Sequence, residues 1–493
     1  MIEALKPLNP ILAIDMYKEG HHKQKPASVK NQWAVTVPRS VSAYSDKIVV
    51  LGNAFVAAMF ASWRIEQWMV DEAEIELNEQ GSDFNREDWE YIIQELGGRL
   101  PLSFYGIEEG RIVDPQTPLN GLTSTDERCN WLVTYYEPFV QSVTWKMSTV
   151  ATLCRSIRVG LLDYCELTGT DKSAVNYMLH NFGDRAGHSP NESVIMAGIA
   201  HAAIFDGSDC VRANRYIKAL YNTTKPSTSS IEATEHNVMM QNSNPETQDD
   251  WGAALMAVDR LYACVERSKR GIGLPLMSVV IDTYDSRRFV KDYLGTKLKD
   301  RILKSGGKMI ARPDTGNPEE EPGLVGLDWK ATFGTTEREV NGKTYDVLHP
   351  QNGVIQGDGI RIDTWRGVVE GWIKTGFALD GFALGMGAGV TSDNARDDFN
   401  FSFKNIASFI GGKWRAELKN PKKGTSDGTS KKSLSGLVRC REDAFGNLEV
   451  YDALHEGNVF SMWDSTPGWR LYSENGYRKW RQTWDDVKQR ARA

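Results

Sequence analysis

The sequence predicts an α/β fold in which parallel strands form a sheet or a barrel, and three observations lead there. Between about residues 175 and 400, short apolar runs end in acidic or glycine clusters and precede segments with helical spacing. These clusters recur at intervals of 32, 44 and 29 residues, the spacing of successive strand–helix units. The chain has 493 residues, which is enough for two or three domains, so other elements must flank this region.

Four strands of this region are expected to end at residues that carry chemistry. The runs MSVVIDTYD, KMIARPDTG, GVIQGDG and FALGMGAG end near Asp282, Asp314, Asp358 and Gly387, respectively. In a βα barrel, the functional groups gather at the carboxyl ends of the strands, so we expect these residues at one edge. Helical segments follow the first and third runs, at 286–305 and 364–377. The longest interval contains REVNGKTYDVL, whose Asn-Gly pair predicts a β-hairpin.

The regions on either side have a mixed character. The first 150 residues alternate short strands and helices, and the last 90 or so return to this pattern. The expected elements are an extended segment at 27–45 with a turn at Pro38-Arg39-Ser40, helical spacing over 53–69, a helix closed by glycine at 85–98, short strands and turns at 110–122, a flexible loop at 422–432 and a terminal helix at 480–493.

Composition excludes several classes of protein. The net charge of -7 argues against general nucleic-acid binding, and no apolar window approaches the ~18 residues of a membrane helix. The first 20 residues do not have the pattern of a signal peptide. Six scattered cysteines without a CxxC fit a reduced, cytoplasmic protein and not a zinc site. One basic segment, residues 413–432, has a local balance of +5 and fits either a solvated loop or a grip for a small polyanion.

Several motifs combine groups that suit a phosphorylated ligand. RPDTGNP places Arg312 and Asp314 at a strand end, where the arginine suits a phosphate or planar ring and the carboxylate suits a hydroxyl or a magnesium ion. A structural Arg–Asp pair is the alternative. GDG (357–359) and GMGAG (385–389) are glycine loops that can approach a phosphate closely, although most such loops are tight turns. Neither a Rossmann GxGxxG nor a P-loop motif is present.

Two further motifs add aromatic and acidic groups. HNFGDRAGHS (180–189) is expected to be a glycine-rich loop that carries an aromatic residue, an arginine and two histidines, which suits a flat heteroaromatic ligand bearing a phosphate. FDGSDCV puts Asp209 just beyond the helical segment ESVIMAGIAHAAIF. In ATEHN, His236 follows a carboxylate, Glu235, and either does chemistry or caps a loop.

Taken together, these motifs resemble those of the nicotinamide phosphoribosyltransferases, which are type II phosphoribosyltransferases. DMYKEGHHKQKP (15–26) is similar to the family's N-terminal motif, and HNFGDRAG, FDGSDCV, ATEHN, SVVIDTYD, RPDTGNP, VIQGDG, GMGAG and NARDDFNFSFK follow in the family's order. The resemblance runs from about residue 11 to residue 450. It implies an incomplete βα-barrel of parallel strands with an additional mixed α+β domain built from the N- and C-terminal regions. The expected boundaries are 1–165, 166–400 and 401–493.

The resemblance also implies a reaction. Nicotinamide and 5-phosphoribosyl 1-diphosphate give nicotinamide mononucleotide and diphosphate, with Mg²⁺ accompanying the diphosphate substrate. It implies a homodimer with shared active sites, whereas it is the composition that predicts a cytoplasmic protein binding neither nucleic acid nor membrane. ATP is implied as an activating phosphoryl donor to His236.

By the same resemblance, specific residues receive roles. Phe182 stacks on the nicotinamide ring, Tyr17 of the other subunit covers its opposite face, and Asp209 accepts a hydrogen bond from the carboxamide. Arg312 lies by the ring and phosphates. The remaining implied residues are Asp314, Gly357, Asp358, Gly387, Ala388 and Arg396 for the ribose and its phosphate, Arg39, Arg185, His236, Lys404 and Lys419 for the diphosphate, and Asp282 with His236, Arg312 and Asp314 as catalytic groups. No direct metal ligand is assigned.

Three positions depart from the family pattern. Asp184 replaces a tyrosine and adds a negative charge near the diphosphate site, Ala388 replaces a glycine at the phosphate, and Asn181 replaces a carboxylate.

Three alternatives to this function stay open: a nicotinate phosphoribosyltransferase, a catalytically inactive binding relative, and an unrelated phosphate-binding barrel lyase. A carboxylate at Asp209 disfavours the first, because it would face the nicotinate carboxylate with like charge. The set of cationic and acidic groups disfavours the second. The third would need a Schiff-base lysine at a strand end, for which the sequence offers no good candidate.

Overall fold

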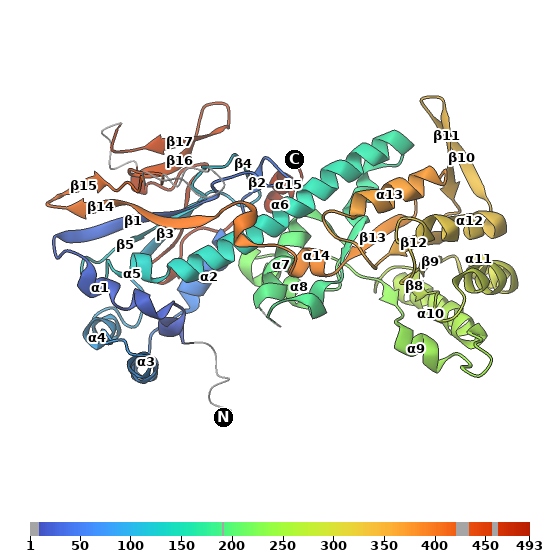
Figure 1. Cartoon of the computed structure of the whole chain (residues 1–493), viewed down its shortest axis with the longest axis horizontal. Coiled ribbons are helices and arrows are strands. Elements are labelled where there is room, and N and C mark those ends of the chain that lie inside the picture. Colours follow the sequence, from blue (N-terminus) through green and yellow to red (C-terminus); the bar gives the residue numbers. More distant parts are fainter. Residues whose placement is uncertain (1–8, 190–191, 421–432, 456–461) are drawn as a thin grey trace. The chain divides into compact units, whose positions relative to one another are not determined.

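The structure is a computed structural model that describes residues 9–189, 192–420, 433–455 and 462–493 (Figure 1). The chain forms two compact units. The first unit comprises residues 1–152, 217–224 and 395–493, and the second comprises residues 153–216 and 225–394. The N- and C-terminal regions therefore fold together as a mixed α+β unit, and the middle of the chain forms the other. The expected loop at 422–432 lies outside the described residues.

The second unit is built on a six-stranded parallel sheet in the order β6-β13-β12-β9-β8-β7. Every neighbouring pair is parallel. From β7 the chain crosses the sheet one strand at a time to β13, which lies beside the first strand of the unit, β6. The strands are β6 (Leu179–Asn181), β7 (Glu232–Ala233), β8 (Leu276–Val280), β9 (Lys308–Arg312), β12 (Asn352–Gln356) and β13 (Phe382–Met386).

Helices connect these strands, as parallel crossovers require. Most of them show one buried face and one exposed face. They are α9 (His236–Gln241), α10 (Trp251–Lys269), the π-helix Arg288–Lys297, α11 (Lys299–Ser305), α12 (Glu321–Phe333) and α13 (Trp365–Lys374), and the short α14 (Ala388–Thr391) follows the last strand. Helix α7 (Glu192–Ile204) follows β6, and α8 (Val211–Tyr221) follows α7. Figure 1 shows α10, α12 and α13 beside the sheet.

Loops almost close the sheet between its two edge strands, β6 and β7. Asn181 at the end of β6 forms a parallel bridge with Ser208, and Gly207 forms another with Ser229, which precedes β7. The amide of Asp209 also donates to the carbonyl of Asn181, at 3.1 Å. The sheet is therefore an incomplete barrel, and the prediction of this fold class is confirmed.

The strand–helix rhythm of the sequence matches the structure in most places. All four expected strands are present, and the hairpin is formed by β10 (Thr335–Val340) and β11 (Lys343–Leu348). At its turn, Asn341 and Gly342 have φ of 50° and 77°, the left-handed conformation that this residue pair favours. The loop predicted at 180–189 begins later in the structure, because residues up to Asn181 belong to β6. A strand of three residues is too short to show a period.

The first unit contains a seven-stranded antiparallel sheet in the order β15-β14-β1-β5-β3-β18-β19. Its core packs aromatic and aliphatic side chains around Trp33 and Trp469, which are both fully buried. The strands are β1 (Val29–Val37), β3 (Leu102–Gly106), β5 (Asn120–Ser124), β14 (Ser402–Ile410), β15 (Lys413–Ala416), β18 (Arg470–Glu474) and β19 (Tyr477–Arg478). Smaller pairs join β2 (Ile48–Val49) to β4 (Ile112–Val113) and β16 (Val438–Glu442) to β17 (Leu448–Asp452).

The expected helices of this unit are present with one difference. Helical spacing over 53–69 corresponds to two helices, α2 (Asn53–Ser62) and α3 (Gln67–Glu79), because the amide of Ile65 donates to the carbonyl of Gly98 and interrupts the helix. The others are α1 (His21–Gln24), α4 (Arg86–Gln94), α5 (Leu132–Tyr135) and the terminal α15 (Trp484–Ala491), while the long α6 (Glu137–Thr168) runs from the first unit into the second.

A buried carboxylate joins separate segments of the first unit. Glu109 accepts hydrogen bonds from the amides of Gly52 and Ala54 at the start of α2, and from Tyr221 and Gln482. Burial raises the pKa of Glu109, and the hydrogen bonds from Tyr221, Ala54 and Gly52 act against that shift. This network explains why residues 217–224 pack with the terminal regions. Among the helices that the structure describes, none has the length and apolar character needed to cross a membrane.

Candidate active site

The carboxyl ends of the parallel strands bring most of the predicted site residues of the second unit to one edge. This follows from the topology, because parallel strands end on the same side of their sheet. Phe182 follows β6, His236 begins α9 after β7, Asp282 follows β8, Arg312 ends β9 and precedes Asp314, Gly357 and Asp358 follow β12, and Gly387 and Ala388 follow β13.

Phe182 lies against a floor made of glycine backbone. A Cβ atom added at Gly385 would lie 2.0 Å from Cε2 of the Phe182 ring, and one at Gly357 would lie 3.4 Å from the same atom. The amide of Phe182 also donates to the carbonyl of Met386, at 2.9 Å. The sequence therefore needs glycine at 385 so that the ring can rest on the ends of β13 and β12. A half-buried aromatic face in this position suits stacking with a flat ligand.

Gly385→Ala should lower the free energy of unfolding by about 1–3 kcal/mol, because the new methyl group overlaps the Phe182 ring. Urea unfolding of the two proteins measures this difference. In a Phe182→Ala background most of the cost should disappear, since the overlapping ring is gone. An equal cost in both backgrounds would show that the glycine is needed for another reason.

Asp209 reaches the same edge through the loops that almost close the barrel. Its Oδ1 accepts a hydrogen bond from the hydroxyl of Ser230, which orients the carboxylate. Beneath it, the ring of His180 packs on Gly207, where an added Cβ would lie 2.6 Å from the imidazole. Burial lowers the pKa of His180, and the Asp209 carboxylate acts in the opposite direction. The carboxylate thus lies near a buried imidazole, on a loop whose backbone is bonded to Asn181, the residue before Phe182.

His236 is held between two carboxylates. Its Nε2 lies 3.2 Å from Oδ1 of Asp282, and its Nδ1 lies 3.6 Å from Oδ2 of Asp314. Only the first distance is short enough for a hydrogen bond, and this bond fixes the orientation of the imidazole. Asp282 is itself fixed, because its Oδ2 accepts from the Asp314 amide at 2.8 Å and from the Thr315 hydroxyl at 2.7 Å. The arrangement holds the imidazole in one orientation, with a carboxylate near each of its nitrogens.

Arg312 has an unused hydrogen-bond donor. Its Nε is buried and bonds to no described atom, and its Nη2 lies 3.9 Å from Oδ2 of Asp314. A Cβ added at Gly357 would approach both Cδ of Arg312, at 3.8 Å, and the Phe182 ring. The Arg312 side chain and the Phe182 ring therefore both lie close to Gly357. A buried donor without a partner fits an acceptor supplied by a ligand.

The loop after β13 is shaped by close packing. Gly389 lies against Met386, whose Sδ would be 2.6 Å from an added Cβ, and Gly183 packs against Thr391 in the same way, at 2.4 Å. Gly387 and Ala388 are half-buried between these contacts. The departure at Asp184 is offset locally, because its carboxylate forms an ion pair with Arg212 of α8, at 2.8 Å.

Asp358 and Arg185 are exposed, in the loop after β12 and in the turn Gly183–Ala186. Neither makes an ion pair that fixes it at the edge of the sheet, within the residues described.

Three of the predicted cations lie together in the first unit. Arg39, Lys404 and Lys419 line a cleft of about 40 Å³ beside the β1–β14 pair. The backbone of Lys419 is tied to Ser433, and Nε of Arg39 donates to the carbonyl of Asn400. A cluster of like charges in one cleft is suited to a polyanion. For the described part of the basic segment, this favours the binding of a small polyanion over a solvated loop.

The two other predicted residues of the first unit lie at its surface. Arg396 forms an ion pair with its neighbour Asp397, at 2.8 Å, and Tyr17 is 59% exposed in a short helical turn, Met16–Lys18. In the described part of the chain, no group of three or more His, Cys, Asp or Glu side chains is arranged to hold a metal ion.

Sequence reasoning missed the residues that support the site. Ser230 orients Asp209, Thr315 fixes Asp282, and Gly385 seats Phe182. Hydroxyl residues in loops carry no distinctive pattern, so the first two gave no signal. Gly385 was grouped with the phosphate loop, although a glycine inside a strand is a signal of close approach by another group.

Comparison with known proteins identifies the family. Residues 177–456 match the model of the Nicotinate phosphoribosyltransferase (NAPRTase) family, and residues 9–104 match that of the Nicotinamide phosphoribosyltransferase N-terminal domain. The chain belongs to the nicotinate phosphoribosyltransferase family. As a member it is a type II phosphoribosyltransferase, a transferase of pentosyl groups.

Individual relatives cover almost the whole chain. A nicotinamide phosphoribosyltransferase of Xanthomonas campestris is 30% identical over 93% of this chain and 94% of its own length. One of Acinetobacter baylyi is 27% identical, with 98% and 97% covered. Two solved structures share the fold at 14% identity. These are nicotinate-nucleotide pyrophosphorylase from Pyrococcus furiosus (TM-score 0.57, 98% of this chain and 94% of that one) and human nicotinic acid phosphoribosyltransferase (TM-score 0.55, 97% and 92%).

Proposed function

We propose that this phosphoribosyltransferase acts on nicotinamide in NAD salvage, converting it with 5-phosphoribosyl 1-diphosphate to nicotinamide mononucleotide and diphosphate. The observation that carries the choice of base is the Asp209 carboxylate, which Ser230 orients on a loop whose backbone is bonded to Asn181, the residue before Phe182. A carboxylate accepts a hydrogen bond from a carboxamide NH₂ but repels the carboxylate of nicotinate. Relatives over almost the full length of the chain carry the name nicotinamide phosphoribosyltransferase.

The proposed mechanism depends on positioning and charge. The ring stacks on Phe182, its carboxamide donates to Asp209, and its nitrogen attacks the anomeric carbon as diphosphate leaves through an oxocarbenium-like state. Arg312 supplies its unused donor beside the ring, and Asp314 accepts from ribose hydroxyls. Backbone at Gly357, Gly387 and Ala388 borders the ribose and its 5'-phosphate, with Asp358 and Arg396 contributing to that site. Mg²⁺ enters as part of the diphosphate substrate.

Production of nicotinamide mononucleotide by the purified protein tests this function. With nicotinamide, phosphoribosyl diphosphate and Mg²⁺, we expect one diphosphate for each mononucleotide formed. Release of diphosphate without mononucleotide would mean hydrolysis and would contradict the proposal.

His236 is proposed to couple ATP to turnover. In the proposed step, Nε2–H donates to Asp282 and the lone pair of Nδ1 attacks the γ-phosphate of ATP. The new bond joins Nδ1 to phosphorus, and ADP leaves. Arg185 and the cleft of Arg39, Lys404 and Lys419 are proposed to bind the diphosphate, with His236 as a further partner when it is protonated.

His236→Ala should abolish stimulation by ATP while leaving slow turnover in its absence. The reason is that the alanine offers no nucleophile, whereas Phe182, Asp209 and Arg312 still position the base. Mononucleotide formation with and without ATP measures the effect, and intact mass after exposure to ATP detects phosphohistidine in the wild type. Equal stimulation of both proteins would contradict the assignment.

We propose a homodimer in which each active site draws residues from both subunits. Support comes from the resemblance, which takes Tyr17 from the partner, and from the 59% exposure of Tyr17, which leaves its ring accessible to a partner. A cytoplasmic location is proposed from the six cysteines, all of them buried and free.

Mixing two inactive variants tests the shared site. Arg312→Ala removes a group of the subunit whose Phe182 binds the ring, and Tyr17→Ala removes the group that the partner subunit supplies. If sites are shared, a heterodimer has one site with both defects and one intact site, so a re-equilibrated mixture should recover up to about a quarter of wild-type activity. Activity no higher than that of the separate variants would contradict a shared site.

Nicotinate is the alternative base, and the family model that covers residues 177–456 is named for it. For that base, the cationic donors near the ring would have to outweigh the repulsion from Asp209.

A further inference from the structure

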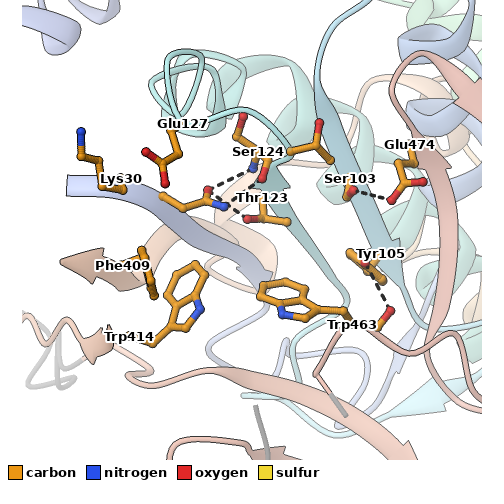
Figure 2. Close-up of a pocket in the computed structure, with 12 residues that line it drawn as sticks. Lys30, Ser103, Tyr105, Thr123, Ser124, Glu127, Phe409, Trp414, Trp463 and Glu474 are labelled. Carbon is orange, nitrogen blue, oxygen red and sulfur yellow. Dashed lines mark hydrogen bonds between the residues drawn. The ribbon is translucent and has the colours of Figure 1, made fainter. Parts of the chain in front are cut away.

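A second pocket lies in the first unit and contains none of the predicted active-site residues. It has a volume of about 400 Å³ and opens on one face of the seven-stranded sheet (Figure 2). Small-molecule sites in proteins typically occupy about 300–1,000 Å³. The pocket is therefore large enough to hold a ligand of its own.

The floor of this pocket is a row of side chains that crosses the sheet. Strand register places Phe409 opposite Trp414 and opposite Asn31, and it places Ser103 opposite both Thr123 and Glu474. The Thr123 hydroxyl donates to Asn31 at 3.1 Å, which joins the two halves of the row. One end of the row is thus aromatic and the other polar.

Most of the polar floor offers acceptors. Each hydroxyl has one proton, and those protons are already used: Thr123 donates to Asn31, and Ser103 donates to Glu474, at 3.2 Å. The side-chain amide of Asn31 also donates to the carbonyl of Ser124. Oxygen lone pairs of Thr123, Ser103 and Glu474 remain, so the floor suits a ligand that is rich in hydroxyl or amine donors.

Aromatic side chains form the wall. Trp463 lies between Trp414 and Tyr105 in Figure 2, with ring centroids 5.7 Å from Trp414 and 6.1 Å from Tyr105. These distances leave no room for a ring between the two indoles, so a planar ligand must lie on their exposed faces. Such faces can stack with any heteroaromatic base, because every base has a π-face.

The charges around the pocket give no net attraction for an anion. Glu127 and Glu474 carry negative charge, and Lys30 carries the one positive charge among the lining side chains that the structure describes. Glu474 also pairs with Lys479, at 3.2 Å. These two carboxylates and two ammonium groups balance, so the rim supplies no excess positive charge to hold a phosphorylated ligand, whereas a neutral ligand needs none.

We propose that this pocket binds an uncharged nucleoside, with its base on the indole faces of Trp414 and Trp463 and its pentose hydroxyls on the Thr123–Ser103–Glu474 floor. A nucleoside combines a flat ring with several donors and no charge, which is the combination that the wall, floor and rim select. The site is distinct in its residues from those that bind the proposed substrates.

Calorimetric titration with adenosine tests the proposal, using wild type and three variants. Trp414→Ala should weaken binding roughly tenfold or more, because a stacking face is lost. Glu474→Gln, which keeps the shape but replaces acceptors with a donor, should also weaken it and serves if Trp414→Ala does not fold. Trp68→Ala, which removes a 41% exposed indole on α3 outside the pocket, should leave binding unchanged.

Further arms exclude the other sources of binding. Phe182→Ala should bind adenosine like the wild type, since its defect lies in the active site; loss of binding there, with retention in Trp414→Ala and Glu474→Gln, would place the nucleoside in the active site and overturn the proposal. Adenosine monophosphate should bind more weakly than adenosine. Methyl glucoside binding as tightly as adenosine would overturn the assignment to nucleosides, and so would the absence of adenosine binding.

Discussion

Replacing Asp209 with asparagine should move the preference of the enzyme from nicotinamide toward nicotinate. The variant replaces a charged acceptor with the neutral oxygen of an amide, which weakens the hydrogen bond to the carboxamide, so kcat/KM for nicotinamide should fall by up to about tenfold. At the same time it loses a like charge that costs nicotinate several kcal/mol, so kcat/KM for nicotinate should rise. The ratio of the two constants measures the combined effect.

The control for this variant is Asp300→Asn, which removes an exposed carboxylate on α11 of the same unit. Its ratio should equal that of the wild type. If Asp209→Asn also keeps the wild-type ratio, then Asp209 does not read the carboxamide, and the choice of base must be made elsewhere.

Replacing Arg312 with alanine should lower kcat/KM on the order of 10²–10³-fold, as is typical when a preorganised donor to a developing charge is removed. The buried Nε of Arg312 has no described partner, and the guanidinium meets the Phe182 ring at Gly357. These features point to a ligand as its acceptor. Steady-state kinetics with both substrates varied measure the loss.

Arg312→Lys separates charge from geometry. Lysine keeps the positive charge but lacks the planar fork, so it should recover only a small part of the lost activity. Arg338→Ala is the matched control, because Arg338 forms an ion pair with Asp380, at 2.6 Å, before the start of β13 and not at the carboxyl edge. Full activity in Arg312→Ala would contradict the role of this residue.

The sequence predicted those parts of the fold that depend on local periodicity. Apolar runs ending at Asp282, Asp314, Asp358 and Gly387 located four strands and the edge at which their chemistry gathers, and Asn341-Gly342 located the hairpin turn. These signals are local, since each lies within one strand or one turn.

Contacts between distant segments could not be predicted in this way. Asp209 reaches the edge through bridges at Ser208 and Ser229, and the charge of Asp184 is offset by Arg212, which lies 28 residues away. The seat of Phe182 on Gly385 joins residues about 200 positions apart. Such contacts are made when the barrel curls, and no short pattern encodes them.

Direct competition between the two bases tests the central claim. Wild-type protein would be incubated with equal concentrations of nicotinamide and nicotinate, phosphoribosyl diphosphate, Mg²⁺ and ATP, and both mononucleotides would be quantified at early times. The proposed function predicts that nicotinamide mononucleotide predominates strongly. Equal amounts of the two products, or an excess of nicotinate mononucleotide, would contradict it.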